Sequence, residues 1–150
     1  MNAAHWHLIV NHISLFTLVI GTGVLIAQMK RRSVDLRILA VVLFVVTAVF
    51  AFVADQTGDS AAEIVKALGS GFDAQIHEHD EAAEWALRSG ILVGLLALGM
   101  EWAARKKPTW FKPLQWVLLV FAIQGCAVFA RTAYLGGMIR HTEIHADQAK

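Results

Sequence analysis

The sequence predicts an all-α integral membrane protein, an antiparallel bundle of four transmembrane helices. Of its 150 residues, 57% are hydrophobic and 17% are charged, which is more apolar than an ordinary soluble domain of this size. Four uniformly apolar segments each approach the roughly 20 residues that a helix needs to cross the hydrocarbon core. No repeat or linker divides the chain, so we expect a single domain over residues 1–150.

Polar connections of unequal length separate the four expected spans. The first and third connections are short, and the second is long. In the long connection Ser60 and Glu63 have the spacing of a capping box, and Gly69 and Gly71 close the segment, which predicts a short helix over the mouth of the bundle. From about Asp73 a single helix can run into the third span. The expected spans are residues 8–29, 36–54, 85–104 and 110–138.

Basic residues mark the two short connections. Short loops rich in Lys and Arg stay on the cytoplasmic side, so we expect both turns in the cytoplasm, and both termini and the short helix in the periplasm, of a bacterial inner membrane. The N-terminus lacks the basic region of a cleaved signal, so the first segment is predicted to remain as a span. The basic residues are Lys30, Arg31, Arg32, Arg37, Arg105, Lys106, Lys107 and Lys112.

The tryptophans agree with this orientation, because Trp is enriched where a membrane helix meets water. We expect Trp6 and Trp85 at the outer interface, and Trp102, Trp110 and Trp116 at or near the inner one.

All seven histidines fall at the predicted periplasmic face, together with most of the twelve acidic residues. Outer loops that avoid Lys and Arg account for the acids but not for the histidines. Imidazoles that converge between the helices of a bundle are typical ligands of haem and of transition metals. The sequence therefore places its candidate site at this face.

The single cysteine limits the cofactors that the chain can hold. Cys126 lies inside an apolar segment and has no second thiol to pair with. An intramolecular disulfide, a thiolate zinc site, covalent c-type haem attachment and an iron–sulfur cluster held by this chain alone are excluded.

Helical periodicity separates the histidines of the third span. At about 100° per residue, His79 shares a face with Gly90 and Gly94. The Gly-x-x-x-Gly spacing lets membrane helices approach closely, so this face is predicted to pack inward and to carry His79 with it. His77 lies on the opposite side and is expected to be solvated.

In the first span, His12 shares a stripe with Phe16 and Gly23, whereas His7 points away from it. His12 lies inside the apolar run, where a polar side chain needs a partner. It is either an inward ligand or an interfacial histidine bonded to a neighbouring backbone group or carboxylate. Near the C-terminus His141 and His145 have the i, i+4 spacing that metal sites use.

Two arginines lie inside the spans and require anions. Glu84 stands at i−4 from Arg88, and Asp55 is the expected partner of Arg131 from span two. The alternative is that these arginines receive haem propionates or a quinone oxygen. Glu101, near the inner end of span three, is expected to reach toward the basic turns.

Several motifs resemble a family of small bacterial four-helix membrane proteins, the domain-of-unknown-function family twenty-two thirty-one. The resemblance spans nearly the whole chain, and implies an integral membrane protein with recurring histidines at His7, His12, His79 and His141. Relatives that look like fusions to Rieske-type domains favour electron transfer. In one departure, Ile13-Ser14 replaces a Phe-Pro of the family. The motifs are Asn2-Ala-Ala-His5-Trp-His7-Leu-Ile-Val-Asn11-His12, Thr57-Gly58 with Ala61-Ala62-Glu63, His79-Asp-Glu-Ala-Ala-Glu84, and Gly136-Gly137-Met-Ile-Arg140-His141-Thr-Glu143-Ile.

The first functional hypothesis is a haem b held by inward histidines of facing helices. His12 would pair with His79 or His141, and Arg88 or Arg131 would lie near the propionates. Electrons would pass between a membrane quinone and a periplasmic redox carrier. On this hypothesis the protein serves electron transfer and is not a stand-alone enzyme.

The second hypothesis is a copper, zinc or iron site at the same face, because imidazole and carboxylate together suit these metals. The third is a non-catalytic accessory subunit of a respiratory complex, as a monomer or homodimer, with a hydrogen-bonded polar cap. The bilayer is a partner in every case, and no basic patch for nucleic acid is present. The candidate metal ligands are His7, His12, His79, His141, Glu63 and Glu84.

Overall fold

The computed structural model describes residues 2–67 and 73–140. Within these ranges the chain is all-helical, with four helices and no strand, which confirms the all-α part of the predicted fold class. Each of the four helices is long and apolar enough to cross a membrane. They are α1 (Ala3–Arg31), α2 (Val34–Ala67), α3 (Asp73–Lys106) and α4 (Pro108–Arg140).

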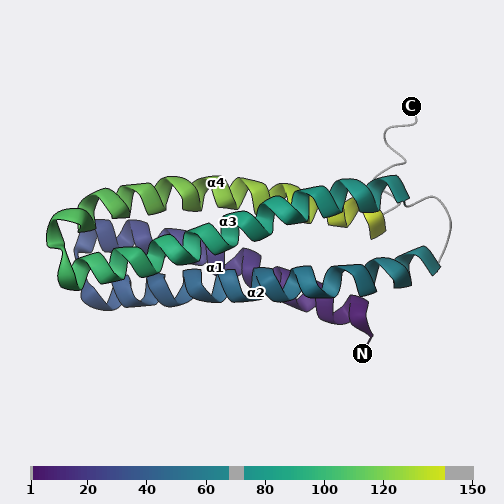
Figure 1. The fold of residues 1–150 in the computed structure, drawn as a ribbon, viewed down its shortest axis with the longest axis horizontal. Coiled ribbons are helices and arrows are strands. Elements are labelled where there is room, and N and C mark those ends of the chain that lie inside the picture. The colour runs from purple at the N-terminus through teal and green to yellow at the C-terminus, as the bar shows by residue number, and fades with distance from the viewer. Residues whose placement is uncertain (1, 68–72, 141–150) are drawn as a thin grey trace.

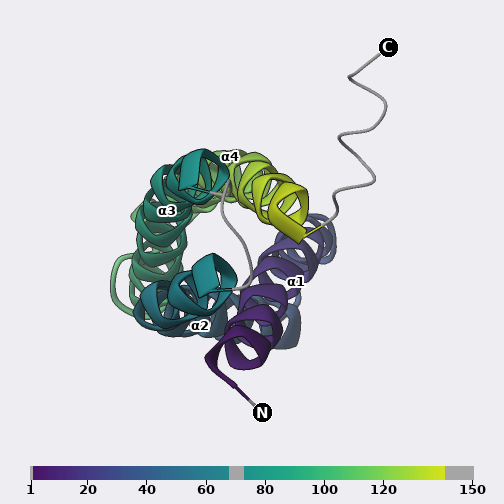
Figure 2. The same cartoon turned by 90° about the vertical axis from the view of Figure 1, so that its right-hand side faces the viewer.

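The helices lie side by side along one long axis (Figure 1). The connections at residues 32–33 and 107 lie together at one end of the bundle, which we call the turn end. The opposite end, where α1 and α3 begin and α2 and α4 finish, we call the histidine end. Seen along the axis, the helices follow one another around the bundle in chain order (Figure 2).

Local capping fixes both ends of α1. The Asn2 side chain accepts a hydrogen bond from the backbone N–H of His5 at 3.1 Å, which satisfies one of the free donors of the first turn. At the other end Arg32 adopts a left-handed conformation with φ of 52°, and its N–H donates to the Gln28 carbonyl at 2.7 Å. This reverses the chain within two residues and starts α2 beside α1.

The outward faces of the helices are apolar and carry aromatic side chains at two levels. Outward Leu, Ile, Val and Phe side chains cover the middle of the bundle. Aromatic rings at both levels are typical of helices that cross a bilayer. The more than half-exposed Trp and Tyr side chains are Trp6, Trp85 and Tyr134 toward the histidine end, and Trp102, Trp110 and Trp116 toward the turn end.

Helices α2 and α3 are longer than a membrane is thick. Each has 34 residues, or about 51 Å at 1.5 Å per residue, against about 30 Å of hydrocarbon. The surplus lies at the histidine end, where α2 carries Asp55, Asp59 and Glu63. The predicted run of one helix from Asp73 into span three is confirmed.

The prediction of a separate short helix after span two is wrong. Residues 55–67 continue α2 without a break, while residues 68–72 lie outside the described chain. A capping box needs a non-helical residue at its start, but Ser60 is helical and exposed, and so is Glu63. Gly58 costs a helix only about 1 kcal/mol, and Ala61 remains buried against the bundle. Packing therefore maintains the helix across the glycine.

Small residues bring α2 and α3 into close contact. A Cβ on Gly90 would lie 3.1 Å from the Ala51 Cβ, and one on Gly94 would lie 2.8 Å from the Ala48 Cβ. The predicted inward glycine face of span three is confirmed. The same face of α3 carries His79 toward the bundle interior, where it is 9% exposed.

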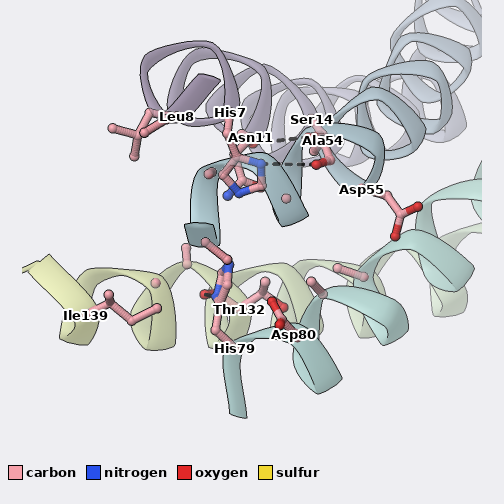
Figure 3. Close-up of a pocket in the computed structure, with 18 of the residues that line it drawn as sticks. His7, Leu8, Asn11, Ser14, Ala54, Asp55, His79, Asp80, Thr132 and Ile139 are labelled. Carbon is pink, nitrogen blue, oxygen red and sulfur yellow. Dashed lines mark hydrogen bonds between the residues drawn. The ribbon is translucent and has the colours of Figure 1, made fainter. Parts of the chain in front are cut away.

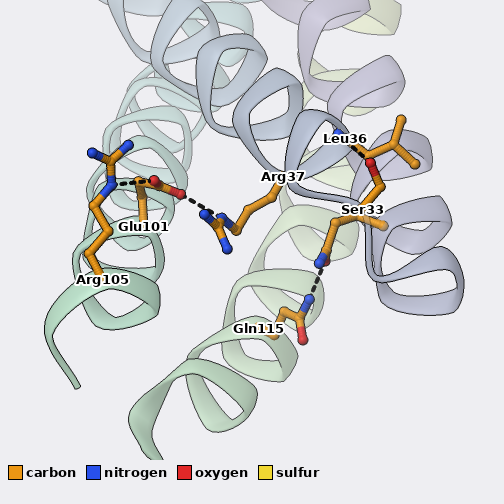
Figure 4. A network of polar contacts seen from close by, with 7 residues as sticks. Ser33, Leu36, Arg37, Glu101, Arg105 and Gln115 are labelled. Atoms are coloured by element: carbon orange, nitrogen blue, oxygen red, sulfur yellow. Dashed lines mark hydrogen bonds and ion pairs between the residues drawn. The ribbon is translucent and has the colours of Figure 1, made fainter. Parts of the chain in front are cut away.

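Polar contacts join the helices at the turn end (Figure 4). Glu101 of α3 accepts from Nε of Arg37 at 2.8 Å and from Nε of Arg105 at 2.7 Å. The expectation that Glu101 reaches toward the basic turns is confirmed. Between α1 and α4, the buried Gln115 amide donates to the Gln28 side-chain oxygen.

Gly94→Ala should destabilise the bundle, because neither its new methyl nor that of Ala48 can rotate away and the two helices must separate. We expect a loss of about 1–3 kcal/mol in the free energy of unfolding, measured as a lower thermal midpoint of the detergent-solubilised protein by circular dichroism.

Gly99→Ala in the same helix is the matched control, because a Cβ there meets nothing within 4 Å. Both changes carry the same gain in helix propensity. Equal midpoints for the two variants would contradict the close packing of α2 on α3.

Candidate functional site

A pocket of about 800 Å³ opens among the four helices at the histidine end. This volume is within the range of cofactor and ligand sites, which is about 300–1,000 Å³. Apolar side chains from all four helices line the pocket, and a small set of polar groups points into it. Its lining includes His7, Leu8, Asn11, Leu15, Ala54, His79, Asp80, Leu87, Phe129, Thr132, Gly136 and Ile139.

His79 is the most buried histidine among the described residues and joins α3 to α4. Its Nδ1 donates to the Thr132 carbonyl at 3.1 Å, and the Thr132 hydroxyl donates back to the Ala82 carbonyl at 3.0 Å. A Cβ on Gly136 would lie 3.0 Å from Cε1 of the imidazole. The glycine therefore leaves the space that the His79 ring occupies.

His7 forms the corresponding contact between α1 and α2. It is half-buried, and its Nδ1 lies 3.0 Å from the Ala54 carbonyl and 3.1 Å from the Thr57 hydroxyl. A carbonyl oxygen can only accept, so Nδ1 carries the proton. The same argument applies to His79 and the Thr132 carbonyl.

The two imidazoles approach each other across the pocket (Figure 3). Their ring centroids are 6.4 Å apart and their planes are 81° apart. With the proton on Nδ1, Nε2 of each neutral ring has a free lone pair, and neither Nε2 has a partner in residues 2–67 and 73–140. Imidazole ligands of metals are held in this way, one nitrogen donating to a carbonyl while the other binds the metal.

The predictions for the third span agree with the structure. His79 faces inward, and the side chain of His77 is 75% exposed. Glu84 accepts from Arg88 at 2.8 Å, as expected for the i, i+4 pair. The Arg88 guanidinium lies 5.1 Å from the centre of the Trp85 ring.

The predictions for the first span are reversed. His7, expected to point away, faces His79, whereas the proposed inward ligand His12 is exposed. Nδ1 of His12 donates to the Leu8 carbonyl of its own helix at 2.6 Å, which is the interfacial alternative stated above. His12 still borders the pocket, but its ring lies beside the outward-facing Phe16.

The reversal has a physical cause. The stripe of His12 and Phe16 is large and apolar, and Phe16 is 58% exposed. The buried stripe of α1 is instead a row of small, polar and aliphatic residues that continues from His7 at helical spacing. Lipid is as apolar as leucine, so bulk hydrophobicity does not mark the inside of a membrane bundle, but small residues do. The buried positions are Val10, Ser14, Leu18, Gly21, Thr22, Leu25 and Gln28.

The alternative role of the two arginines, beside a haem propionate, is not supported by their positions, and the expected pairing of Arg131 with Asp55 is wrong. Neither Arg88 nor Arg131 lines the pocket, so neither is placed to receive a haem propionate there. Arg131 is exposed on α4 and forms no ion pair within the described residues. Asp55, its expected partner, is also exposed and accepts from Gln56 at 3.0 Å.

The other expected ligands differ in position. Glu84 borders the pocket, whereas Glu63 is exposed on α2 and does not line it. His141 and His145 lie outside the described residues. Within residues 2–67 and 73–140, no group of three or more His, Cys, Asp or Glu side chains is arranged to hold a metal ion. The described site therefore consists of two facing histidines.

Sequence reasoning missed three contributors to the site. The carbonyls of Ala54 and Thr132 orient the rings, and backbone groups leave no mark in a residue pattern. The third is Gly136, whose missing side chain leaves space for the His79 ring within a helix that continues to Arg140. The signal that could have found His7 was its helical spacing with Ser14 and Gly21.

Comparisons of the chain with protein-family models, with curated proteins and with solved structures found no match. Membership of the family named above therefore stays a prediction.

The hydrogen bonds to carbonyls predict an uncommon tautomer for both histidines. We expect ¹⁵N spectra of histidine-labelled protein at mildly alkaline pH to show the proton on Nδ1 of His7 and His79, with assignments from single His→Gln variants. His77 provides the comparison, because its Nε2 lies 3.4 Å from Glu81 and should carry the proton. Protonation of Nε2 in His7 or His79 would contradict the described orientation of that ring.

Proposed function

We propose that the chain is a four-span antiparallel protein of the bacterial inner membrane that holds one haem b at its periplasmic face and serves electron transfer. The basic turn end lies in the cytoplasm by the positive-inside rule. The histidine end and both termini then lie in the periplasm. The surplus length of α2 and α3 carries the acidic residues beyond the hydrocarbon at that end.

The observation that supports haem binding best is the facing pair His7 and His79. The ring centroids of His7 and His79 are 6.4 Å apart across the pocket, so both histidines would hold a haem that is bound between them. Each ring is held by its Nδ1 and has a free Nε2. Facing histidines from different helices are a common way for a bundle to hold haem.

The residues that line the pocket are also suited to a haem. Leu8, Leu15, Leu87, Phe129 and Ile139 provide apolar walls that would exclude water. Gly136 leaves space beside the His79 ring, and a haem bound there would supply a one-electron redox couple. The residues of this chain would bind the group, orient the two imidazoles and keep the surroundings dry, and the wall composition would influence the potential.

The number of protein donors favours haem over a bare ion. A structural zinc site uses four protein ligands, and a catalytic one uses three. A haem brings its own four nitrogens and needs at most two axial ligands from the chain. Two facing histidines in the described residues match the second requirement.

A transition-metal site is the second candidate, because carboxylates border the same pocket. Asp80 and Glu84 both line it, and His141 of the undescribed C-terminus is the predicted third imidazole. Copper, zinc or iron would suit such a set. This candidate requires His141 for binding, whereas the haem proposal with His7 and His79 does not.

A redox role implies partners on both sides of the electron path. The position of the pocket at the periplasmic end of the spans favours exchange with a membrane quinone or a periplasmic carrier. A respiratory complex is a third possible partner, because it can both donate and accept electrons. We propose these partners from the location of the site alone.

Four single histidine variants test the proposal. We expect His7→Ala and His79→Ala each to weaken haemin binding at least about 100-fold, since changes in the second shell alone cost about 10–100-fold. Binding is measured by titrating the detergent-solubilised apoprotein and following the Soret absorbance. His12→Ala on α1 and His77→Ala on α3 are matched controls that should bind haemin like the wild type.

Circular dichroism of each variant separates a lost ligand from a lost fold. Equal haemin affinity in all four variants would contradict axial ligation by His7 and His79. If the wild-type protein binds copper or zinc at about one ion per chain, and the His141→Ala variant does not, the transition-metal site is established instead. If the protein binds neither haem nor a metal, the hypothesis of an accessory subunit remains.

A further inference from the structure

A second cavity lies at the turn end, bounded by the end of α1, the start of α2 and the first turns of α4. Its volume is about 570 Å³, which again is within the range of ligand sites. It lies at the opposite end of the bundle from the histidine pocket. The haem proposal gives it no role.

The lining of this cavity is strongly basic. Lys30, Arg32, Arg37 and Lys112 border it, and the described lining contains no carboxylate. The cations come from three different segments, the end of α1, the start of α2 and the start of α4. Four positive charges around one cavity repel one another unless an anion lies between them.

Arg37 is held in a position that leaves part of its charge available. Its Nε donates to Glu101 at 2.8 Å, and the guanidinium lies 5.8 Å from the centre of the Phe111 ring. Glu101 is shared with Arg105, which donates to it at 2.7 Å, so one carboxylate serves two cations. The two terminal nitrogens of Arg37 have no partner in the described chain and can donate to an anion.

Two buried amides add polar atoms to the same cavity. Gln28 and Gln115 are 4% and 6% exposed, and both border it. They hydrogen-bond to each other between α1 and α4. The side-chain N–H₂ of Gln28 donates no hydrogen bond within the described residues, so it can donate to an anion in the cavity.

The position of the cavity along the bundle indicates which kind of anion it would bind. Trp116 borders it and is 62% exposed, and Trp102 and Trp110 are exposed at the same end. Such tryptophans mark the headgroup region of a bilayer. Ile26, which is 38% exposed, also lines the cavity and provides apolar contact for an acyl chain. We propose that the turn-end cavity binds the phosphate headgroup of an anionic phospholipid.

Native mass spectrometry of the full chain in detergent tests this proposal with phosphatidylglycerol as the probe. We expect it to bind more tightly than phosphatidylcholine of the same chain length. Lys30→Gln/Lys112→Gln should weaken phosphatidylglycerol binding roughly 10- to 30-fold, given about 1 kcal/mol per basic residue near the membrane surface. If the double variant does not fold, each single variant should show a smaller loss in the same direction.

Arg31→Gln/Lys107→Gln is the matched control, because it removes two charges from the same end at positions that do not line the cavity. We expect it to change the affinity less than about threefold. Equal losses in the two double variants would show a general charge effect and would overturn the site. Displacement of the lipid by millimolar inorganic phosphate would show that free phosphate is the ligand, and would overturn the lipid assignment.

Discussion

The hydrogen bonds from imidazole Nδ1 to backbone carbonyls are the interactions on which the histidine end depends. The Ala54 and Thr132 carbonyls each hold one ring, at 3.0 and 3.1 Å. Each bond joins two helices, α1 to α2 through His7 and α3 to α4 through His79. The same bonds set the tautomer and leave both Nε2 atoms without a partner in the described residues. One contact therefore serves both packing and the proposed chemistry.

Packing inside this bundle depends on small residues and polar contacts. Gly94 brings α3 against Ala48 of α2, and the hydroxyls of Thr17 and Thr47 lie 2.9 Å apart between α1 and α2. In a bilayer, burial of apolar surface provides little free energy for helix association. Close packing and interhelical hydrogen bonds must therefore provide it. The polar ends differ in charge. Carboxylates and histidines gather at one end, and Lys and Arg gather at the other.

Much of the fold could be predicted from the sequence, because span length, basic turns and interfacial tryptophans each have a simple physical cause. The inward face of α3 was also predictable, since Gly90 and Gly94 mark a close contact that carries His79 with it. The choice between His7 and His12 could not be made from the apolar run, because hydrophobicity does not mark the inner face of a membrane helix. Packing also outweighed local signals at Ser60, where α2 continues through an apparent helix start. The carbonyl partners of the histidines could not be predicted, since they depend on how the helices pack.

The measurement that tests the central claim most directly is a dithionite-reduced minus oxidised visible spectrum of the purified wild-type protein, with elemental analysis of the same sample. Two imidazoles on one haem iron predict a sharp α-band with about one iron per chain. A sample with neither a Soret band nor iron, from cells supplied with haem, would contradict the claim that His7 and His79 hold a haem.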